Sequence, residues 1–580
     1  MNWKILKRLF VYVKPLKIEF IINVVSGIIG TIFAAMIPVI VGNAIDLAIG
    51  QGNVDFNGIF RNTIILFLLA ILCSVFQWMY SFYGASFSYK LSNNIRDEMF
   101  KRINYMPLSY MDTKPHGDIV SRMINDLDAV SEGVMQFNQV FSGIIMVVGT
   151  IVFMMLISVK VSLMVIILTP LFILVSYFIV SKSYIAFRSQ AKLQGDLTGY
   201  TEEMISQQKI VSAFKYEKCA IQKFGTINEK LYKSGVDSQF YSSLTNPSIR
   251  FVSVLIYALV GVYGAMIVLG EQTLTIGQVS SLLIYVNQYT RPFIEITSVV
   301  TQLQSATAAL QRVFNVLDEN VEEPDKDNPV KLNDCKGNVS IENLYFSYTK
   351  DTSLIEDFNL EVKSGQKIAI VGPTGCGKTT IINLLMRFYE PTKGQIKIDG
   401  IPIRDMTRED LRNLYGMVLQ DTWLYSGTVR DNIAYGCESA SDEKIIEAAK
   451  AANADNFIRK LEHGYNTILL ENGVNISQGQ KQLLCIARVM MKDPKILILD
   501  EATSNIDTRT EQKVQEAFDK LMKGRTSFVV AHRLSTIRNA DIILVMNNGN
   551  IIEKGSHDKL IQQDGFYSKM YYSQFEMKNI

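Results

Sequence analysis

A glycine-rich segment has the residue types and spacing of a phosphate-binding loop. The sequence GPTGCGKT (residues 372–379) follows the strand-like IAIV and precedes the helix-like IINLLMRF. Glycines allow backbone N–H groups to wrap phosphate oxygens, and the N-terminus of the following helix favours negative charge. Lys378 is expected to reach the β- and γ-phosphates of ATP, and the Thr379 hydroxyl to bind Mg²⁺. The residues expected to bind ATP in and next to this segment are Gly372, Thr374, Gly375, Cys376, Gly377, Lys378, Thr379 and Thr380.

Two adjacent carboxylates end a second hydrophobic run. The sequence KILILDE (residues 495–501) finishes with Asp500 and Glu501. Asp500 suits the Mg²⁺ shell, directly or through water. Glu501 suits a base that polarises the attacking water. Paired carboxylates also occur at solvated strand ends, but a phosphate loop upstream favours the catalytic interpretation.

Three further polar residues fit the same chemistry because of their order along the chain. His532 ends the strand-like SFVVAH and could hydrogen-bond a γ-phosphate and orient water. Gln420 follows LYGMVL and could contact both Mg²⁺ and the water. Tyr348 lies 30 residues before Lys378 and could stack on an adenine. Taken alone, each residue is more often an ordinary core or surface residue.

A polar loop, NISQGQKQ (residues 475–482), precedes another helix-like pattern. Gln478 occupies a position where a glycine would give the backbone more freedom to grip an anion. We therefore expect an altered anion contact at this loop.

The first half of the chain is membrane-like. Of the 580 residues, 48% are hydrophobic, and the mean hydropathy is +0.15. A membrane-spanning helix needs about 20 mostly apolar residues. Six uncharged runs approach or exceed that length, which predicts six spans. The runs are residues 20–45, 62–89, 141–159, 161–180, 251–270 and 272–290.

Basic residues predict the orientation of these spans. Five lysines and arginines precede the first run, which indicates a cytosolic N-terminus, and that run is too long for a cleavable signal peptide. Segments 90–140 and 181–250 are then also cytosolic, as helical extensions. The sixth run is followed by Arg291 and Glu295, which either face a cavity or lie at the cytosolic interface. The basic residues are Lys4, Lys7, Arg8, Lys14 and Lys17.

The sequence changes character after the last run. We expect a transmembrane domain at 1–318, an acidic linker at 319–337 and a nucleotide-binding α/β domain at 338–580. The runs 368–372, 496–500 and 527–532 resemble buried parallel strands. None of the six cysteines forms a C-x-x-C pair, which argues against zinc and thioredoxin chemistry. The net charge of +2 implies no attraction to nucleic acid.

Together these motifs resemble the ATPase domain of ABC transporters. In chain order they match its A-loop, Walker A, Q-loop, signature, Walker B, D-loop and switch histidine. With six spans ahead of them, the whole chain resembles a bacterial ABC exporter half-transporter of the multidrug and lipid type. The implied fold is a six-helix type IV exporter domain fused to a cytosolic α/β P-loop ATPase. The motifs are Tyr348, residues 372–379, Gln420, residues 477–480, Asp500 with Glu501, SNID (residues 504–507) and His532.

The resemblance implies ATP-driven export of amphipathic small molecules or drugs across the bacterial cytoplasmic membrane by alternating access. ATP and Mg²⁺ would be the cofactors. Two chains would pair, with each ATP between the Walker A of one chain and the signature of the other. Loops around 111–122 and 203–216 would contain the coupling helices, the second docking on the partner's ATPase domain. Alternatives are a homodimeric lipid flippase and an ATP-gated, channel-like membrane protein.

The implied roles follow from the matched motifs. Glu501, His532 and Gln420 would be catalytic, and Thr379, Gln420 and Asp500 would hold the metal. Asp507 would belong to the D-loop. The signature residues that serve the partner's ATP would be Ser477, Gln478, Gly479 and Gln480.

The signature departs from the usual Leu-Ser-Gly-Gly-Gln by carrying Ile476 and Gln478. Because this loop serves the partner's ATP, the departure predicts one altered and one sound ATP site. That asymmetry resembles the consensus-site subunit of heterodimeric multidrug exporters, whose partner usually lacks the Walker B glutamate. Asn505, where the family often has alanine, fits the same subgroup. Neutral drift within a homodimer is the alternative.

Overall fold

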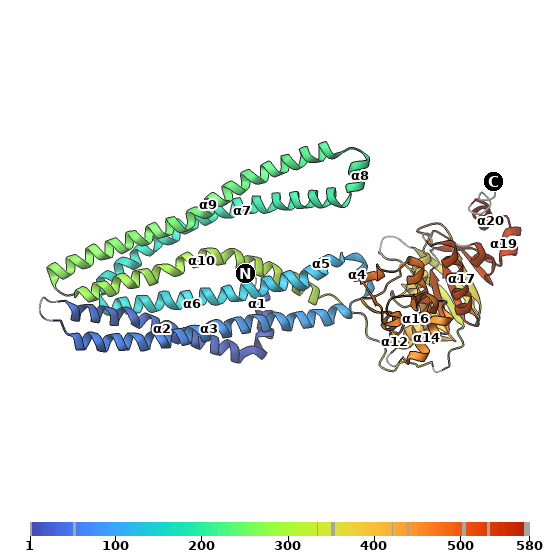
Figure 1. Ribbon diagram of the computed structural model, residues 1–580, viewed down its shortest axis with the longest axis horizontal. Coiled ribbons are helices and arrows are strands. Elements are labelled where there is room, and N and C mark those ends of the chain that lie inside the picture. Colours follow the sequence, from blue (N-terminus) through green and yellow to red (C-terminus); the bar gives the residue numbers. More distant parts are fainter. Residues whose placement is uncertain are drawn as a thin grey trace. The chain divides into compact units, whose positions relative to one another are not determined.

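The computed structural model describes residues 3–49, 54–332, 334–349, 354–419, 422–437, 440–500, 506–530 and 534–573 (Figure 1). The chain divides into two compact units. The first comprises Met1–Tyr105 and Lys114–Glu319, and the second comprises Met106–Thr113 and Asn320–Ile580. The short segment Met106–Thr113 therefore belongs with the second unit, although it lies between helices of the first unit in the sequence.

The first unit consists of helices. Helices α2 and α3 pack along each other, as do α6 and α10 and also α7 and α9. Helices α7 and α9 are joined at one end by the short α8 (Figure 1). The helices are α1 (Trp3–Val13), α2 (Lys17–Ala48), α3 (Phe56–Asn104), α5 (His116–Ser121), α6 (Leu127–Ile157), α7 (Val159–Ser206), α8 (Gln208–Ala213), α9 (Glu217–Met266) and α10 (Ile276–Leu317).

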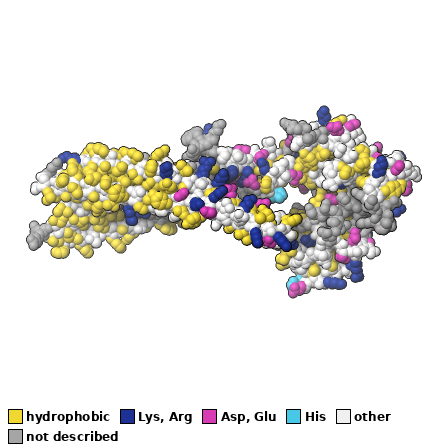
Figure 2. Space-filling model, turned by 90° about the horizontal axis from the view of Figure 1, so that it is seen from above, with side chains coloured by type: hydrophobic (Ala, Val, Ile, Leu, Met, Phe, Trp, Pro, Cys, Tyr) yellow, Lys and Arg dark blue, Asp and Glu magenta, His cyan; other side chains and the backbone are white. Residues whose placement is uncertain are grey.

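Within the described residues, five helical segments are long and apolar enough to cross a membrane. Figure 2 shows a broad band of hydrophobic side chains over part of the first unit, as expected for a lipid-facing surface. Helix α10 covers the sixth predicted run but is not among these five segments. Polar residues such as Asn287 and Gln288 along it explain its lower apolarity. The five segments are Lys7–Ala48, Phe56–Asn104, His116–Ile157, Val159–Ser206 and Glu217–Gly270.

A close contact joins the end of α2 to the start of α10. Oδ1 of Asp46 accepts the backbone N–H of Gly277 (2.7 Å), and Oδ2 accepts the Thr275 hydroxyl (2.5 Å). A Cβ added to Gly277 would lie 2.0 Å from the carbonyl oxygen of Gly42. The two backbones can approach this closely because both positions are glycine.

The second unit contains the predicted parallel strands. Its six-stranded sheet has the order β12-β11-β3-β10-β9-β6, and all neighbours except β11 and β12 are parallel. The runs 368–372 and 496–500 and the described part of the run 527–532 correspond to three of these strands, which confirms the predicted parallel strands. The strands are β3 (Lys367–Val371), β6 (Tyr415–Val418), β9 (Ile496–Asp500), β10 (Thr526–Val530), β11 (Ile542–Asn547) and β12 (Asn550–Gly555).

Both faces of this sheet are covered by apolar side chains. Leu499 and Val529 belong to the cluster on one face, and Ile498 and Phe528 belong to the cluster on the other. This explains why the parallel strands read as continuous apolar runs. The helices of this unit are α4 (Leu108–Thr113), α11 (Lys378–Leu385), α12 (Arg408–Leu414), α13 (Val429–Ile433), α14 (Asp442–Ala451), α15 (Asp455–Ile458), α16 (Gln478–Lys492), α17 (Thr508–Met522), α18 (Leu534–Arg538), α19 (His557–Gln562) and α20 (Phe566–Tyr571).

An antiparallel sheet of order β2-β1-β4-β5 and a two-stranded sheet of β7 and β8 complete the unit. The segment just after Asn320 is held to the second unit by ion pairs. Arg408 pairs with Asp325 (2.9 Å) and with Glu322 (3.3 Å). The remaining strands are β1 (Val339–Phe346), β2 (Ile355–Val362), β4 (Lys393–Ile398), β5 (Ile401–Pro402), β7 (Gly427–Thr428) and β8 (Ile468–Leu469).

The α2–α10 contact predicts a stability effect. In Gly42→Ala the new Cβ would lie 2.0 Å from Oγ of Ser281 and 2.5 Å from the carbonyl oxygen of Gly277. The helices must separate, which costs roughly 1–3 kcal/mol. We expect a lower Tm for the purified protein. Gly270→Ala is the control, because nothing lies within 4 Å of a Cβ there. Equal Tm values for both variants would contradict the tight packing.

Candidate nucleotide-binding site and transmembrane cavity

The carboxyl ends of parallel strands gather the predicted nucleotide residues at one edge of the sheet. The phosphate-binding loop follows β3, and β10 is hydrogen-bonded between β3 and β9. Asp500, the last residue of β9, lies opposite Val530 of β10, and Val530 lies opposite Ile370 of β3. Ligands of open α/β sheets bind at this edge. The strand order therefore brings Asp500 to the edge that carries the loop.

The three residues predicted to be catalytic lie outside the described residues. Gln420 follows the last residue of β6 by two positions, Glu501 follows that of β9 by one, and His532 follows that of β10 by two. Asn505 also lies outside the described residues. The roles predicted for these four residues stay predictions.

The loop at 372–377 has the backbone geometry that requires glycine. Gly375 and Gly377 have φ of +81° and +98°, values that side chains disfavour. A Cβ on Gly372 would lie 2.3 Å from the carbonyl oxygen of Met546. The ammonium of Lys378 donates to the carbonyl oxygens of Gly372 and Pro373, both at 2.9 Å. This loop can wrap an anion, with the Lys378 charge beside it.

The remaining residues predicted to bind ATP in this segment differ in exposure. Thr374 and Thr379 are exposed, whereas Cys376 and Thr380 are buried. The exposed Thr379 hydroxyl and the Asp500 carboxylate supply oxygen atoms, which Mg²⁺ prefers as ligands. These residues are compatible with a magnesium ion beside bound phosphates.

Tyr348 stands next to the helix that follows the loop. Its hydroxyl lies 3.2 Å from Oγ1 of Thr380, and the residue is 49% exposed. Its ring packs edge-on against Tyr389, with ring centroids 5.0 Å apart. Part of the aromatic surface thus remains available to a planar ligand.

The hydrogen bond between Tyr389 and Asp112 was not predicted from the sequence. The Tyr389 hydroxyl donates to Oδ2 of Asp112 (2.5 Å), which lies on α4. Burial, together with this bond to Asp112, raises the pKa of Tyr389. The predicted coupling region at 111–122 therefore reaches the surroundings of Tyr348 through one side chain. No motif marks either residue, and only packing identifies them.

The signature loop forms the start of helix α16. Oγ of Ser477 accepts the N–H of Gln480 (3.4 Å), and the Gln480 side chain accepts the N–H of Ser477 (2.9 Å). This reciprocal capping fixes the helix N-terminus. Gln478 is the first helical residue, and its φ is not left-handed. This helical position does not require glycine, and the altered anion contact predicted at Gln478 stays a prediction.

The side chain of Gln478 is exposed and anchored to a neighbouring segment. Its Nε2 donates to Oγ1 of Thr422 (3.1 Å). Gly479, by contrast, is buried, and a Cβ there would lie 2.3 Å from Cγ2 of Thr510. Glycine is thus needed at 479 but not at 478. What remains at 478 is a polar side chain on the exposed first turn of α16.

Asp507 caps helix α17. Its carboxylate accepts the N–H of Thr510 (2.9 Å), and this bond holds the pKa of Asp507 below its usual range. Because Thr510 also packs on Gly479, the predicted D-loop and signature are fastened to each other within one unit.

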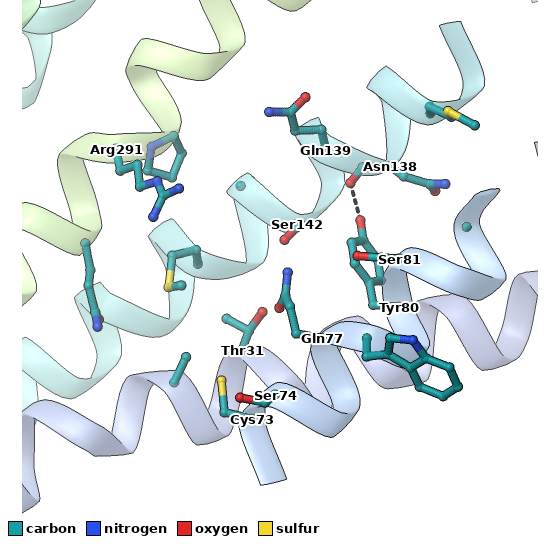
Figure 3. A pocket seen from close by; sticks show the side chains of 18 of the residues that line it. Thr31, Cys73, Ser74, Gln77, Tyr80, Ser81, Asn138, Gln139, Ser142 and Arg291 are labelled. Carbon is teal, nitrogen blue, oxygen red and sulfur yellow. Dashed lines mark hydrogen bonds between the residues drawn. The ribbon is translucent and has the colours of Figure 1, made fainter. Parts of the chain in front are cut away.

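The first unit contains a partly open cavity of about 970 Å³ lined by residues of α2, α3, α6 and α10 (Figure 3). Its lining is polar for a membrane-spanning bundle, with amide and hydroxyl side chains from all four helices and Arg291 from α10. No sequence motif indicated this cavity, because it depends on how the helices pack. The amide and hydroxyl residues are Thr31, Ser74, Gln77, Tyr80, Ser81, Asn138, Gln139, Ser142 and Gln288.

This combination of a phosphate loop, a parallel sheet and a fused helical bundle defines a membrane-embedded ATPase. Residues 20–293 match the ABC transporter transmembrane region, and residues 355–504 match the ABC transporter family. The chain belongs to the ABC transporter family. The first match falls on the first unit apart from Met106–Thr113, and the second match falls on the second unit.

Similar proteins share nearly the whole length. The uncharacterized ABC transporter ATP-binding protein YfiC of Bacillus subtilis is 40% identical over 572 residues, which cover 98% of this chain and 94% of that protein. A fatty acid ABC transporter ATP-binding/permease protein of Mycobacterium bovis is 39% identical over 522 residues, covering 90% and 82%. The structure of a bacterial Atm1-family ABC exporter with ATP bound superposes with a TM-score of 0.77 at 26% identity, covering 97% and 98%.

These findings confirm the predicted fold class of a type IV exporter domain fused to a P-loop ATPase. The chain is a bacterial ABC exporter half-transporter that couples ATP hydrolysis to transport. It is a multi-pass protein of the cytoplasmic membrane with its ATPase unit in the cytosol.

The packing at Gly479 predicts a contrast between adjacent signature residues. Gly479→Ala forces α16 away from Thr510 and should lower the free energy of unfolding by roughly 1–3 kcal/mol. Gln478→Ala loses one exposed hydrogen bond, worth about 1 kcal/mol or less. Thermal unfolding of the purified protein checks this. Equal destabilisation by Gln478→Ala and Gly479→Ala would contradict the conclusion that helix packing requires a glycine at 479 but not at 478.

Proposed function

We propose that this chain is one half of a heterodimeric exporter that moves amphipathic small molecules out of the cytosol. The transport function is supported by one observation: the same chain contains a cavity lined by polar side chains and a phosphate-binding loop. The related fatty acid transporter of Mycobacterium bovis supports an amphipathic substrate.

In this proposal each ATP lies between the phosphate loop of one chain and the signature of the other. Lys378 and the loop N–H groups hold the phosphates, and Tyr348 stacks on the adenine. Thr379, Gln420 and Asp500 would hold Mg²⁺, which neutralises phosphate charge when bound. Glu501 accepts a proton from the attacking water, and His532 orients the γ-phosphate. The transmembrane domain comprises residues 1–318, the linker 319–337 and the ATPase domain 338–580.

ATP at a shared interface favours the closed pair of ATPase domains, because it binds that state better than the open one. Two segments would carry this change to the membrane helices. Helix α4 continues from α3 after three residues, and its Asp112 is bonded to Tyr389. Helix α8 is followed by Phe214, which is 80% exposed. An apolar side chain so exposed suits contact with a partner chain.

The asymmetry rests on Gln478. Its exposed side chain lies on the first turn of α16, the helix end that would face the partner's nucleotide. A glutamine there adds bulk beside the phosphate without a compensating charge. The partner's ATP site would therefore turn over slowly, and the site that uses this chain's Glu501 would do most of the hydrolysis.

Glu501→Gln tests the catalytic assignment. The amide cannot accept the water proton, so we expect steady-state ATPase activity to fall by at least about a hundredfold, while ATP still binds. Steady-state hydrolysis and nucleotide titration measure the two properties. Lys378→Ala is the matched variant, which should weaken ATP binding itself. Undiminished turnover in Glu501→Gln would remove that residue from catalysis.

The heterodimer proposal is tested by expressing the chain alone. Any homodimer would contain two altered signatures, so its ATPase activity should be low. Gln478→Gly should raise that activity by at least about tenfold, a barrier difference near 1.4 kcal/mol. A stable homodimer with vigorous, substrate-stimulated activity that Gln478→Gly leaves unchanged would favour neutral drift instead.

A further inference from the structure

We propose that the transmembrane cavity selects amphiphiles with an anionic head group, which Arg291 and neighbouring amides bind. This inference rests on the proposed export function and narrows its substrate class. It is carried by the position of Arg291, by the composition of the lining and by the size of the cavity.

Arg291 lies one residue beyond the sixth predicted run, towards the cytosolic end of the membrane-spanning part of α10. Helix α10 starts at its outer end with Ile276, and a rise of 1.5 Å per residue puts Arg291 roughly 22 Å further along. The hydrocarbon core is about 30 Å thick. Charged side chains near membrane depth usually face the bundle interior or water, where they often bind substrates or ions. Figure 3 shows Arg291 pointing from α10 into the space that Gln77 enters from α3.

The charge of the lining favours anions. Among the described residues that line the cavity, Arg291 is the one charged side chain, and no carboxylate is present. A guanidinium has five N–H donors, so it can bind a carboxylate or phosphate alongside the interaction it already makes.

Amide groups around the cavity can complete the head-group site. Nδ2 of Asn138 and Oε1 of Gln288 are buried and make no hydrogen bond within the described part of the chain. Unpaired buried amide atoms are unfavourable, and a polar ligand can supply the missing partners. Both residues line the cavity, as does Gln77.

The rest of the lining suits a hydrocarbon or aromatic tail. Met135 and Met146 line the cavity together with Trp78, which is 65% exposed. Flexible thioethers and an indole face accommodate tails of different shapes. The cavity of about 970 Å³ is at the upper end of the range of roughly 300–1,000 Å³ for ligand pockets. A lipid-sized amphiphile with one acidic group fits this combination.

Matched fluorescent probes test the proposal on the purified full transporter in nanodiscs. The probes are dansyl-aminoundecanoic acid, its uncharged primary amide and dansyl-undecyl-trimethylammonium. We expect the acid to bind at least about tenfold tighter than the amide, a difference near 1.4 kcal/mol. Dodecyl phosphate and decanoate as competitors then distinguish phosphate from carboxylate head groups.

Three variants test whether Arg291 causes the preference for the acid over the amide. Arg291→Gln should bring the ratio of acid to amide affinity close to one, and Arg291→Lys should retain part of it. Arg250→Gln is the control, because Arg250 is exposed on α9 and is not in the cavity lining. Its ratio should equal that of the unchanged protein.

Each outcome decides the question. Equal affinity for acid and amide, tighter binding of the cationic probe, or selectivity that survives Arg291→Gln would overturn the proposal. If neutral or cationic amphiphiles are transported while the acid is not, only this inference fails. If no amphiphile of any charge is transported, the proposed export function fails with it.

Discussion

The parallel arrangement of β3, β10, β9 and β6 is the constraint on which the ATPase unit depends. Parallel strands end at the same edge, so residues far apart in sequence arrive together without any local signal. The phosphate loop and Asp500 meet there because Val530 is paired with both Ile370 and Asp500. Apolar side chains on both faces hold this sheet, and the exposed edge is left for polar chemistry.

The membrane unit is organised by an opposite requirement. Its helices must be apolar outside, yet a transport pathway needs polar groups inside. The structure reconciles the two by collecting amides, hydroxyls and Arg291 on the sides of α2, α3, α6 and α10 that face the cavity. The glycine contact between α2 and α10 keeps those helices close at one end. Helix α10 contributes Gln288 and Arg291 to the lining, and polar residues along it explain why it differs from the five strongly apolar segments.

Much of the fold was predictable because it depends on short, local sequence patterns. Apolar runs predicted the strands β3, β9 and β10, and glycine spacing predicted the phosphate loop. Features that depend on contacts between distant elements were not predictable. Two examples are the packing of Thr510 on Gly479 and the hydrogen bond between Asp112 and Tyr389. Only the folded structure reveals these contacts. The helix start after Ser477 was predictable from the pattern and is confirmed at Gln478, whereas the altered anion contact predicted there stays a prediction.

We propose that ATP hydrolysis at the edge of this sheet drives an amphiphile through the transmembrane cavity. The most direct test is accumulation of dansyl-aminoundecanoic acid in sealed inside-out vesicles containing the transporter. We expect concentrative uptake with ATP and Mg²⁺, and none with ADP or a non-hydrolysable ATP analogue. Uptake that is equal with and without hydrolysable ATP, or that only equilibrates across the membrane, would contradict it.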